Sequence, residues 1–289
     1  MGNQGWTLVW SDEFDGNAID PEKWASIVDC WGGGNEERQC YTDASANLHV
    51  GEGKLVITAR HETASGAAWP EHMRAHVSDP DAQATKPFTS AKLVTKGKAS
   101  WKYGRIEVRA RLPQGQGVWP AIWMLPENDT YGAWAASGEI DILEAVNLGV
   151  ECDRCETGGE NTILGTLHFG GQWPENLLTS TEVSRPEVLD GFHDFGVIWE
   201  PGRFRWTFDG VVYAEKSDED WSTTGSSEAN APFNQPFYLI LNLAIGGGLP
   251  EERALGGVSS EGFPKHFEVD WVRVWQCGER SASAEDCGI

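Results

Sequence analysis

Positive charge is scarce in this chain of 289 residues: 22 lysines and arginines stand against 44 aspartates and glutamates, giving a formal net charge of −22 at pH 7. Such a surface repels nucleic acids, anionic membranes and sulfated polymers, whereas a neutral polymer meets no such penalty. The sequence also lacks an apolar run long enough to span a bilayer. We therefore expect neither nucleic acid nor membrane as a partner.

Long helical periods, internal repeats and clear interdomain linkers are also missing. Short segments that alternate apolar and polar residues lie instead between Gly, Pro, Asn and Asp clusters, and they predict strands at Lys54–Arg60, Arg105–Arg111, Arg203–Phe208 and Glu268–Val274. An Asp-Gly pair after Phe208 predicts a tight hairpin.

Evenly distributed strands of this kind predict an all-β fold, a jelly-roll sandwich of two curved antiparallel sheets with an open cleft on the concave face. We expect a single domain over residues 1–289, with a core at about 6–276 and a short polar tail at 277–289. The stretches Glu62–Pro87 and Gly149–Asn161 are interpreted as surface loops.

Six cysteines form three near-neighbour couples, Cys30 with Cys40, Cys152 with Cys155 and Cys277 with Cys287. Proximity favours three short disulfides in a secreted protein, although six cysteines allow fifteen pairings. Cys152 and Cys155 could alternatively form half of a zinc site or a redox pair. No secretory leader is visible, so export is inferred from the cysteines alone.

The segment Gly138–Glu144, reading GEIDILE, places three carboxylates in an otherwise apolar run. Because strand side chains alternate, Glu139 and Asp141 share a face and Glu144 should point away from it. A β-bulge at Ile142-Leu143 would return Glu144 to the shared face. Glu139 and Glu144 would then lie on the order of 6 Å apart, near the roughly 5–5.5 Å of retaining glycosidases.

This spacing suggests Glu139 as the nucleophile and Glu144 as the general acid and then base. Asp141 between them should raise the pKa of a neighbouring glutamate and keep one carboxyl protonated. A solvated acidic strand face is the alternative. Aromatic residues around the motif, which could stack on sugar rings, favour the catalytic interpretation.

The motif resembles the active-site strand of glycoside hydrolase family 16 in its bulged form, which is typical of bacterial laminarinases. Further segments are similar to family motifs in the expected order: Leu8–Phe14, Ile19–Trp24, Trp31–Thr42, Tyr103–Glu107, Leu112–Pro126 and Phe267–Trp275. The resemblance spans roughly residues 6 to 276. It implies an endo-1,3-β-glucanase acting on laminarin-type glucan, with mixed 1,3-1,4-β-glucan as a further substrate. We expect the protein to be a monomer.

The resemblance also implies site residues. Glu139, Asp141 and Glu144 match the family's nucleophile, its assistant and its acid/base. The sugar contacts that it implies are Asn35, Trp119, Trp123, Trp134 and His168, for which core packing is the alternative interpretation. It implies no catalytic cofactor, but a structural calcium on the convex side held by Glu13, the backbone carbonyl of Gly53 and Asp270.

Two positions depart from the family pattern. Lys92 stands where many relatives carry Arg, and a lysine cannot make the same bidentate contact. The loop Gly246–Glu252 lacks an aromatic residue of the usual motif and adds two acids near one rim of the cleft. Alternatives therefore stay open: a sister specificity such as agarase or xyloglucan transglycosylase, or a non-catalytic glucan-binding lectin. Retention of all three acids argues against the lectin.

Overall fold

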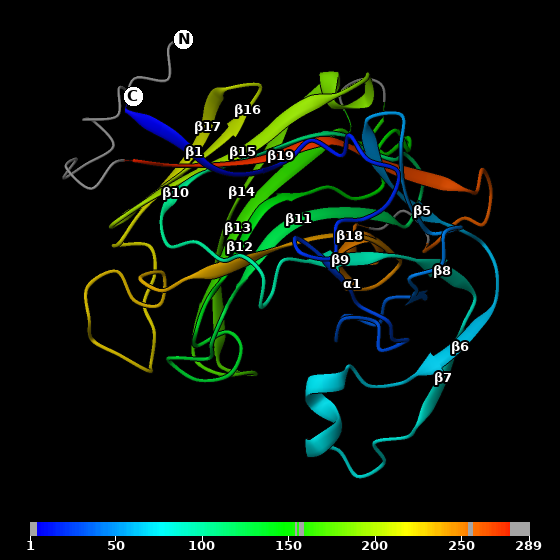
Figure 1. Ribbon diagram of the computed structural model, residues 1–289, viewed down its shortest axis with the longest axis horizontal. Coiled ribbons are helices and arrows are strands. Elements are labelled where there is room, and N and C mark those ends of the chain that lie inside the picture. Colours follow the sequence, from blue (N-terminus) through cyan, green and yellow to red (C-terminus); the bar gives the residue numbers. More distant parts are fainter. Residues whose placement is uncertain (1–4, 154, 156–158, 254–256, 278–289) are drawn as a thin grey trace.

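The computed structural model describes residues 5–153, 155, 159–253 and 257–277, and two curved antiparallel sheets lie face to face in it (Figure 1). The predicted all-β sandwich is confirmed. The eight-stranded sheet has the order β17 (Val211–Ser217), β16 (Arg203–Phe208), β15 (His193–Glu200), β10 (Gly104–Arg111), β19 (Lys265–Cys277), β5 (Lys54–Ala59) and β4 (Leu48–Gly51), and β1 (Trp6–Asp12) also pairs with β19.

The seven-stranded sheet carries the acidic motif close to its middle. Its order is β14 (Asn176–Ser184), β13 (Thr162–Gly170), β12 (Glu139–Glu144), β11 (Val118–Pro126), β18 (Phe237–Ile245), β9 (Lys92–Val94) and β2 (Ala25–Ser26). Alternation along each strand sends one set of side chains into the sandwich and the other onto the open face. Ile106 and Val197 of the first sheet thus pack with Ile140 and Leu241 of the second in one buried cluster.

All four strands predicted from alternation are present, and the Asp-Gly hairpin joins β16 to β17. Phe208 pairs with Val211, while Asp209 and Gly210 have φ values of 49° and 74°. Positive φ at both central residues is what the two-residue hairpin turn requires.

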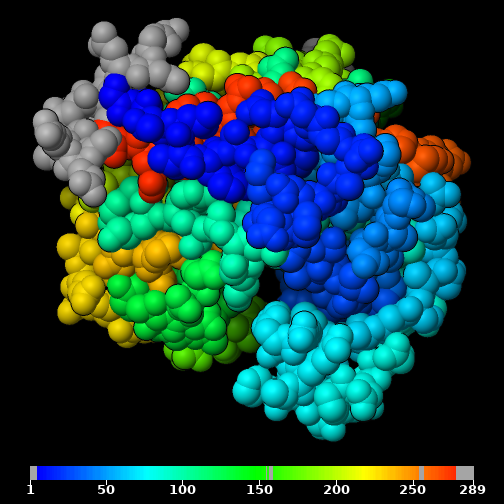
Figure 2. All heavy atoms as spheres, in the orientation of Figure 1, coloured from blue at the N-terminus to red at the C-terminus, as the bar shows by residue number. Residues whose placement is uncertain are grey.

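The stretch Glu62–Pro87 was predicted to be a loop, and this prediction is wrong. It forms an arm of two paired strands, β6 (Ala64–Ala67) and β7 (Gln83–Lys86), around the short helix η1 (Glu71–His76). Figure 1 shows the arm extending from the sandwich, and Figure 2 shows the surface notched between this cyan arm and green segments of the chain. The arm therefore forms one wall of a groove.

Smaller elements complete the chain. β3 (Gln39–Tyr41) and β8 (Phe88–Ser90) form a parallel pair, η2 (Pro186–Leu189) precedes β15, and α1 (Gly248–Glu252) lies within the predicted rim loop. No described helix is long and apolar enough to cross a membrane.

The disulfides Cys30–Cys40 and Cys152–Cys155 are both present, as predicted. Of the third predicted couple, Cys277 ends β19 and Cys287 lies outside the described residues, as does the tail after Cys277.

Candidate active site

The predicted bulge in β12 is present. On β11, Ile122 pairs with Leu143 and Trp123 with Asp141, so Ile142 is the extra residue between them. The register against β13 shifts at the same place. Two residues of β12 therefore oppose one on each neighbour, which is the geometry of a β-bulge.

The bulge divides the side chains of β12 between two faces. Ile140 and Leu143 are fully buried in the core between the sheets. Glu139 and Glu144 are only partly buried and lie with Asp141 on the open face, where residues of β11 and β13 reach them. A regular strand would instead have turned Glu144 toward the face of Ile140.

Each of the two glutamates accepts a hydrogen bond from its own tryptophan. The Trp134 indole donates to Glu139 Oε2 at 2.8 Å, and the Trp119 indole donates to Glu144 Oε1 at 3.1 Å. The Trp134 side chain is 37% exposed, whereas Trp119 is 8% exposed and packs against Val146. Trp134 thus presents ring surface beside Glu139, and Trp119 mainly fixes Glu144.

His168 lies beside Glu139 and Asp141. It is the cross-strand partner of Glu139, and its Nε2 lies 3.6 Å from Glu139 Oε1 and 3.4 Å from Asp141 Oδ2. Its ring centroid is 5.6 Å from that of Trp134. The structure thus brings together six residues that the sequence assigned to one site: Glu139, Asp141, Glu144, Trp119, Trp134 and His168.

Burial and mutual repulsion govern the protonation of this cluster. Burial, with the nearby Asp141 charge, raises the pKa of Glu139 to about 7 and that of Glu144 to about 8. Burial lowers the pKa of His168, but its hydrogen bond to Asp141 and the acids around it outweigh this and raise it to about 9. The raised pKa of His168 favours its cationic form, and the raised pKa values of both glutamates favour their protonated forms.

A second polar chain supports the neighbouring tryptophan. The Trp123 indole donates to Asn242 Oδ1 at 2.6 Å, the Asn242 amide donates to Tyr41 Oη at 3.0 Å, and that hydroxyl donates to Glu37 Oε2 at 3.2 Å. Gln39 also donates to this Glu37 oxygen at 2.6 Å. Trp123 is thereby held in one orientation beside Asp141, its partner on β12.

Sequence reasoning missed Asn242 and Glu37. Asn242 is the one amide in the buried, otherwise apolar strand β18, and this isolation was a readable signal. Glu37 lies within the segment Trp31–Thr42, but no spacing rule identifies it as a buried carboxylate that accepts several hydrogen bonds.

The comparisons with known proteins decide the family. Residues 36–273 match the family model described as Glycosyl hydrolases family 16. The chain belongs to this family. It is 41% identical to a beta-glucanase of Rhodothermus marinus over 94% of this chain and 85% of that protein. It is 39% identical to glucan endo-1,3-beta-glucosidase A1 of Niallia circulans, over 94% of this chain but only 38% of that longer protein.

Solved structures of family 16 have the same fold. The laminarinase from Rhodothermus marinus superposes with a TM-score of 0.76 at 38% identity, covering 96% of this chain and 99% of that one. A non-specific endo-beta-1,3(4)-glucanase co-crystallised with 1,3-beta-D-cellotriosyl-glucose gives a TM-score of 0.72 at 33% identity, covering 94% and 95%.

Two residues at the edge of this candidate site, Asn35 and Lys92, have different surroundings. Asn35 is exposed, and its side chain donates to Glu37 Oε1 at 3.2 Å while its carbonyl accepts from Gly248 of α1 at 2.9 Å. Lys92 lies on the open face with its ammonium 4.5 Å from the centre of the Trp123 ring. Burial lowers the pKa of Lys92. The lysine thus stacks on the tryptophan, a contact that needs no bidentate geometry.

Both carboxylates implied for the calcium site contact arginines. Glu13 accepts from Arg273 at 2.9 and 2.7 Å, and Asp270 lies 3.3 Å from Arg109 Nε. Gly53, with φ of 72°, is in the turn between β4 and β5. Both oxygens of Glu13 are thus occupied by Arg273, whereas Ca²⁺ takes free carboxylate and carbonyl oxygens. The calcium site stays a prediction.

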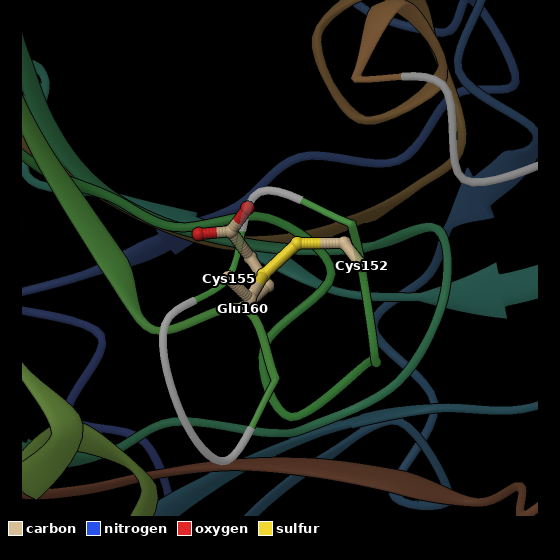
Figure 3. A group of neighbouring side chains, drawn as sticks. All are labelled: Cys152, Cys155 and Glu160. Carbon is tan, nitrogen blue, oxygen red and sulfur yellow. A yellow bond between two sulfur atoms is a disulfide. The ribbon is translucent and has the colours of Figure 1, made fainter.

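The zinc interpretation of the Cys-x-x-Cys segment is wrong. Cys152 and Cys155 are joined in a disulfide, with Glu160 of the same loop beside them (Figure 3). Zinc takes thiolates, and an oxidised pair has none to give.

Proposed function

We propose that this chain hydrolyses internal 1,3-β-D-glucosidic bonds of laminarin-type glucan with retention of configuration. The observation that carries the proposal is the bulge in β12, which puts Glu139 and Glu144 on one face with a tryptophan donor on each. The names of the family 16 relatives, glucan endo-1,3-beta-glucosidase among them, support the same substrate.

In the first step, Glu139 attacks the anomeric carbon as the bond from that carbon to the glycosidic oxygen breaks. Glu144 gives its proton to the departing oxygen, and the sugar is left esterified to Glu139. In the second step, Glu144 removes a proton from water as the water oxygen attacks the same carbon, and Glu139 leaves as a carboxylate. The raised pKa of Glu144, caused by burial and the Asp141 charge, supports its role as the acid, because the acid must hold its proton until the glycosidic bond breaks.

Asp141 and His168 set the charge of the site. The Asp141 carboxylate disfavours a second negative charge nearby and so favours the protonated acid. The His168 cation partly offsets the negative charge on Glu139 and Asp141. Neither group exchanges atoms with the substrate, and no step of this mechanism uses a metal ion.

The sugar contacts belong to the proposal as well. Trp134 offers its exposed ring face to a sugar beside Glu139, and Trp123, Trp119, His168 and Asn35 line the path on either side of β12. The arm formed by β6, η1 and β7 is the opposite wall. A groove along this face suits cleavage within a polymer, and we propose mixed 1,3-1,4-β-glucan as a second substrate.

We propose a secreted monomer that acts as a single catalytic domain, and the two disulfides support export. A structural calcium would require Arg273 to leave Glu13. Measuring Tm with added calcium and with a chelator tests this, because an unchanged Tm would remove the ion from the proposal.

Product analysis tests the function. Laminarin, lichenan, agarose and xyloglucan are incubated with wild type and Glu139→Gln, and products are resolved by size and by anomer. We expect a ladder of β-configured oligosaccharides from laminarin that the substitution abolishes. Activity confined to another polymer would overturn the substrate. Binding of glucan without hydrolysis would assign the chain to the binding proteins, which are also relatives: a beta-1,3-glucan-binding protein of Penaeus monodon is 30% identical.

A further inference from the structure

Trp206 connects the two sheets at the bulge. It belongs to β16 of the eight-stranded sheet, is 1% exposed, and its indole donates to the backbone carbonyl of Asp141 at 2.8 Å. Asp141 belongs to β12 of the opposite sheet. The carbonyl that immediately precedes the bulged residues is therefore bound from the far side of the core.

The strand next to β12 is shaped to admit this indole. Ile142 and Leu143 together face one residue of β13, Gly165, because Asp141 pairs with Thr166 and the next registered pair lies beyond the glycine. A methyl group on Gly165 would strike Cδ1 of Trp206. The glycine thus leaves the space through which the indole reaches the carbonyl.

We propose that Trp206 is a positioning residue that holds the β12 bulge and thereby keeps Glu144 on the same face as Glu139. The inference rests on the proposed function, since it concerns the acid/base of that reaction. A bulge leaves backbone groups outside the regular ladder, and a buried carbonyl needs a donor. Without the indole, β12 is free to relax toward regular pairing, which turns Glu144 away from Glu139.

Trp206→Phe tests the inference, with Trp199→Phe as the matched control. Trp199 is also 1% exposed, lies on the adjacent strand β15, and its indole N–H meets no acceptor among the described residues. Both substitutions remove a similar volume from one core, but only the first removes a donor to β12. At equal loss of Tm, we expect kcat of Trp206→Phe to fall about 10- to 100-fold below that of Trp199→Phe, with KM within about two-fold.

A pH profile separates positioning from simple loss of stability. When Glu144 moves away from Asp141, both its burial and the charge beside it change, so the basic limb of kcat/KM should move from its wild-type position in Trp206→Phe. In Trp199→Phe the limb should stay where it is in wild type. Equal kcat and equal basic limbs in the two variants would overturn the inference.

Gly165→Ala decides the question if Trp206→Phe does not fold. Its methyl displaces the indole while keeping the tryptophan, and Gly196→Ala, another tight strand glycine on β15, is its control. The same fall in kcat and the same shift of the basic limb are expected in Gly165→Ala alone, and their absence counts against the inference. If Glu139→Gln cleaves laminarin as fast as wild type, the proposed function is wrong. Differences in kcat and pH profile between Trp206→Phe and Trp199→Phe then cannot be assigned to Glu144 as acid/base.

Discussion

At the scale of single residues, two tryptophans hold the two glutamates in matching ways but should affect different limbs of the pH profile. The reaction needs Glu139 ionised and Glu144 protonated, so kcat/KM should follow a bell whose acid limb reports Glu139 and whose basic limb reports Glu144, with both pKa values raised by burial. Each indole hydrogen bond stabilises a carboxylate and so lowers its pKa. Trp134→Phe should raise the acid limb and Trp119→Phe the basic limb. Initial rates across pH measure both, and a variant that moves the other limb would refute the role assignment.

The same residues make folding stability depend on pH. A carboxyl whose pKa is raised on folding contributes stability that is full below the unfolded-state pKa and is lost as pH rises through the folded-state value. For Glu139 and Glu144 this loss should be complete above about pH 8. His168, with its pKa raised to about 9, loses its contribution in the same direction. Because of these pKa shifts, we expect Tm to fall as pH is raised from about 5 to about 9. The fall in Tm should be smaller in Glu144→Gln. An equally steep fall in that variant would contradict this prediction.

At the scale of elements, the arm depends on a disulfide that is distant in the sequence. The Cys30 amide donates to Ala67 of β6 at 2.8 Å, and Lys86 of β7 donates to the Glu37 carbonyl at 2.8 Å. The Cys30–Cys40 bridge therefore ties the arm to the loop that carries Asn35. Loss of a bridge closing ten residues should cost about 2–3 kcal/mol of stability.

Replacing both Cys30 and Cys40 by Ala should accordingly speed hydrogen exchange in β6 and β7 and raise KM for laminarin, while kcat changes little because β12 is untouched. Removing Cys152 and Cys155 is the control, since that bridge lies in the loop between β12 and β13. It should leave exchange in the arm unchanged. Similar exchange in β6 after both double substitutions would show that the first bridge does not hold the arm.

Elements also show what the sequence could predict. The bulge was predictable because Glu144 is out of phase with Glu139 in an otherwise regular strand, and one extra residue corrects the phase. The arm was not, because β6 reads ASGA and β7 reads QATK, without the alternating apolar residues that mark a strand. Contacts with the disulfide stabilise them instead. The Trp206 contact leaves no local signal either, since its two partners meet only after both sheets have formed.

At the scale of the whole molecule, uncompensated negative charge opposes compaction. Ion pairs such as Arg203–Glu215 and Arg60–Glu62 lie on the surface, and exposed pairs of this kind contribute about 0–1 kcal/mol each. With 44 acids against 22 bases, repulsion should exceed these pairs. We therefore expect Tm to rise as NaCl is increased from about 10 mM to 0.5 M, over which the Debye length falls from about 30 Å to below 8 Å. A falling Tm in the same titration would show that the ion pairs dominate.

The same charge should select the polymer. A relative from Sphingobacterium multivorum that is 31% identical over 93% of this chain is named keratan-sulfate endo-1,4-beta-galactosidase, after a sulfated substrate. Repulsion between that polymer and a surface of net charge −22 is screened by salt, whereas binding of neutral laminarin involves no net charge. Glu139→Gln, which should bind without cleaving, allows both affinities to be measured by titration. Binding of laminarin should stay constant across the salt range, and binding of keratan sulfate should be undetectable at low salt. If keratan sulfate binds as well as laminarin at low salt, local contacts in the groove rather than overall charge set the specificity.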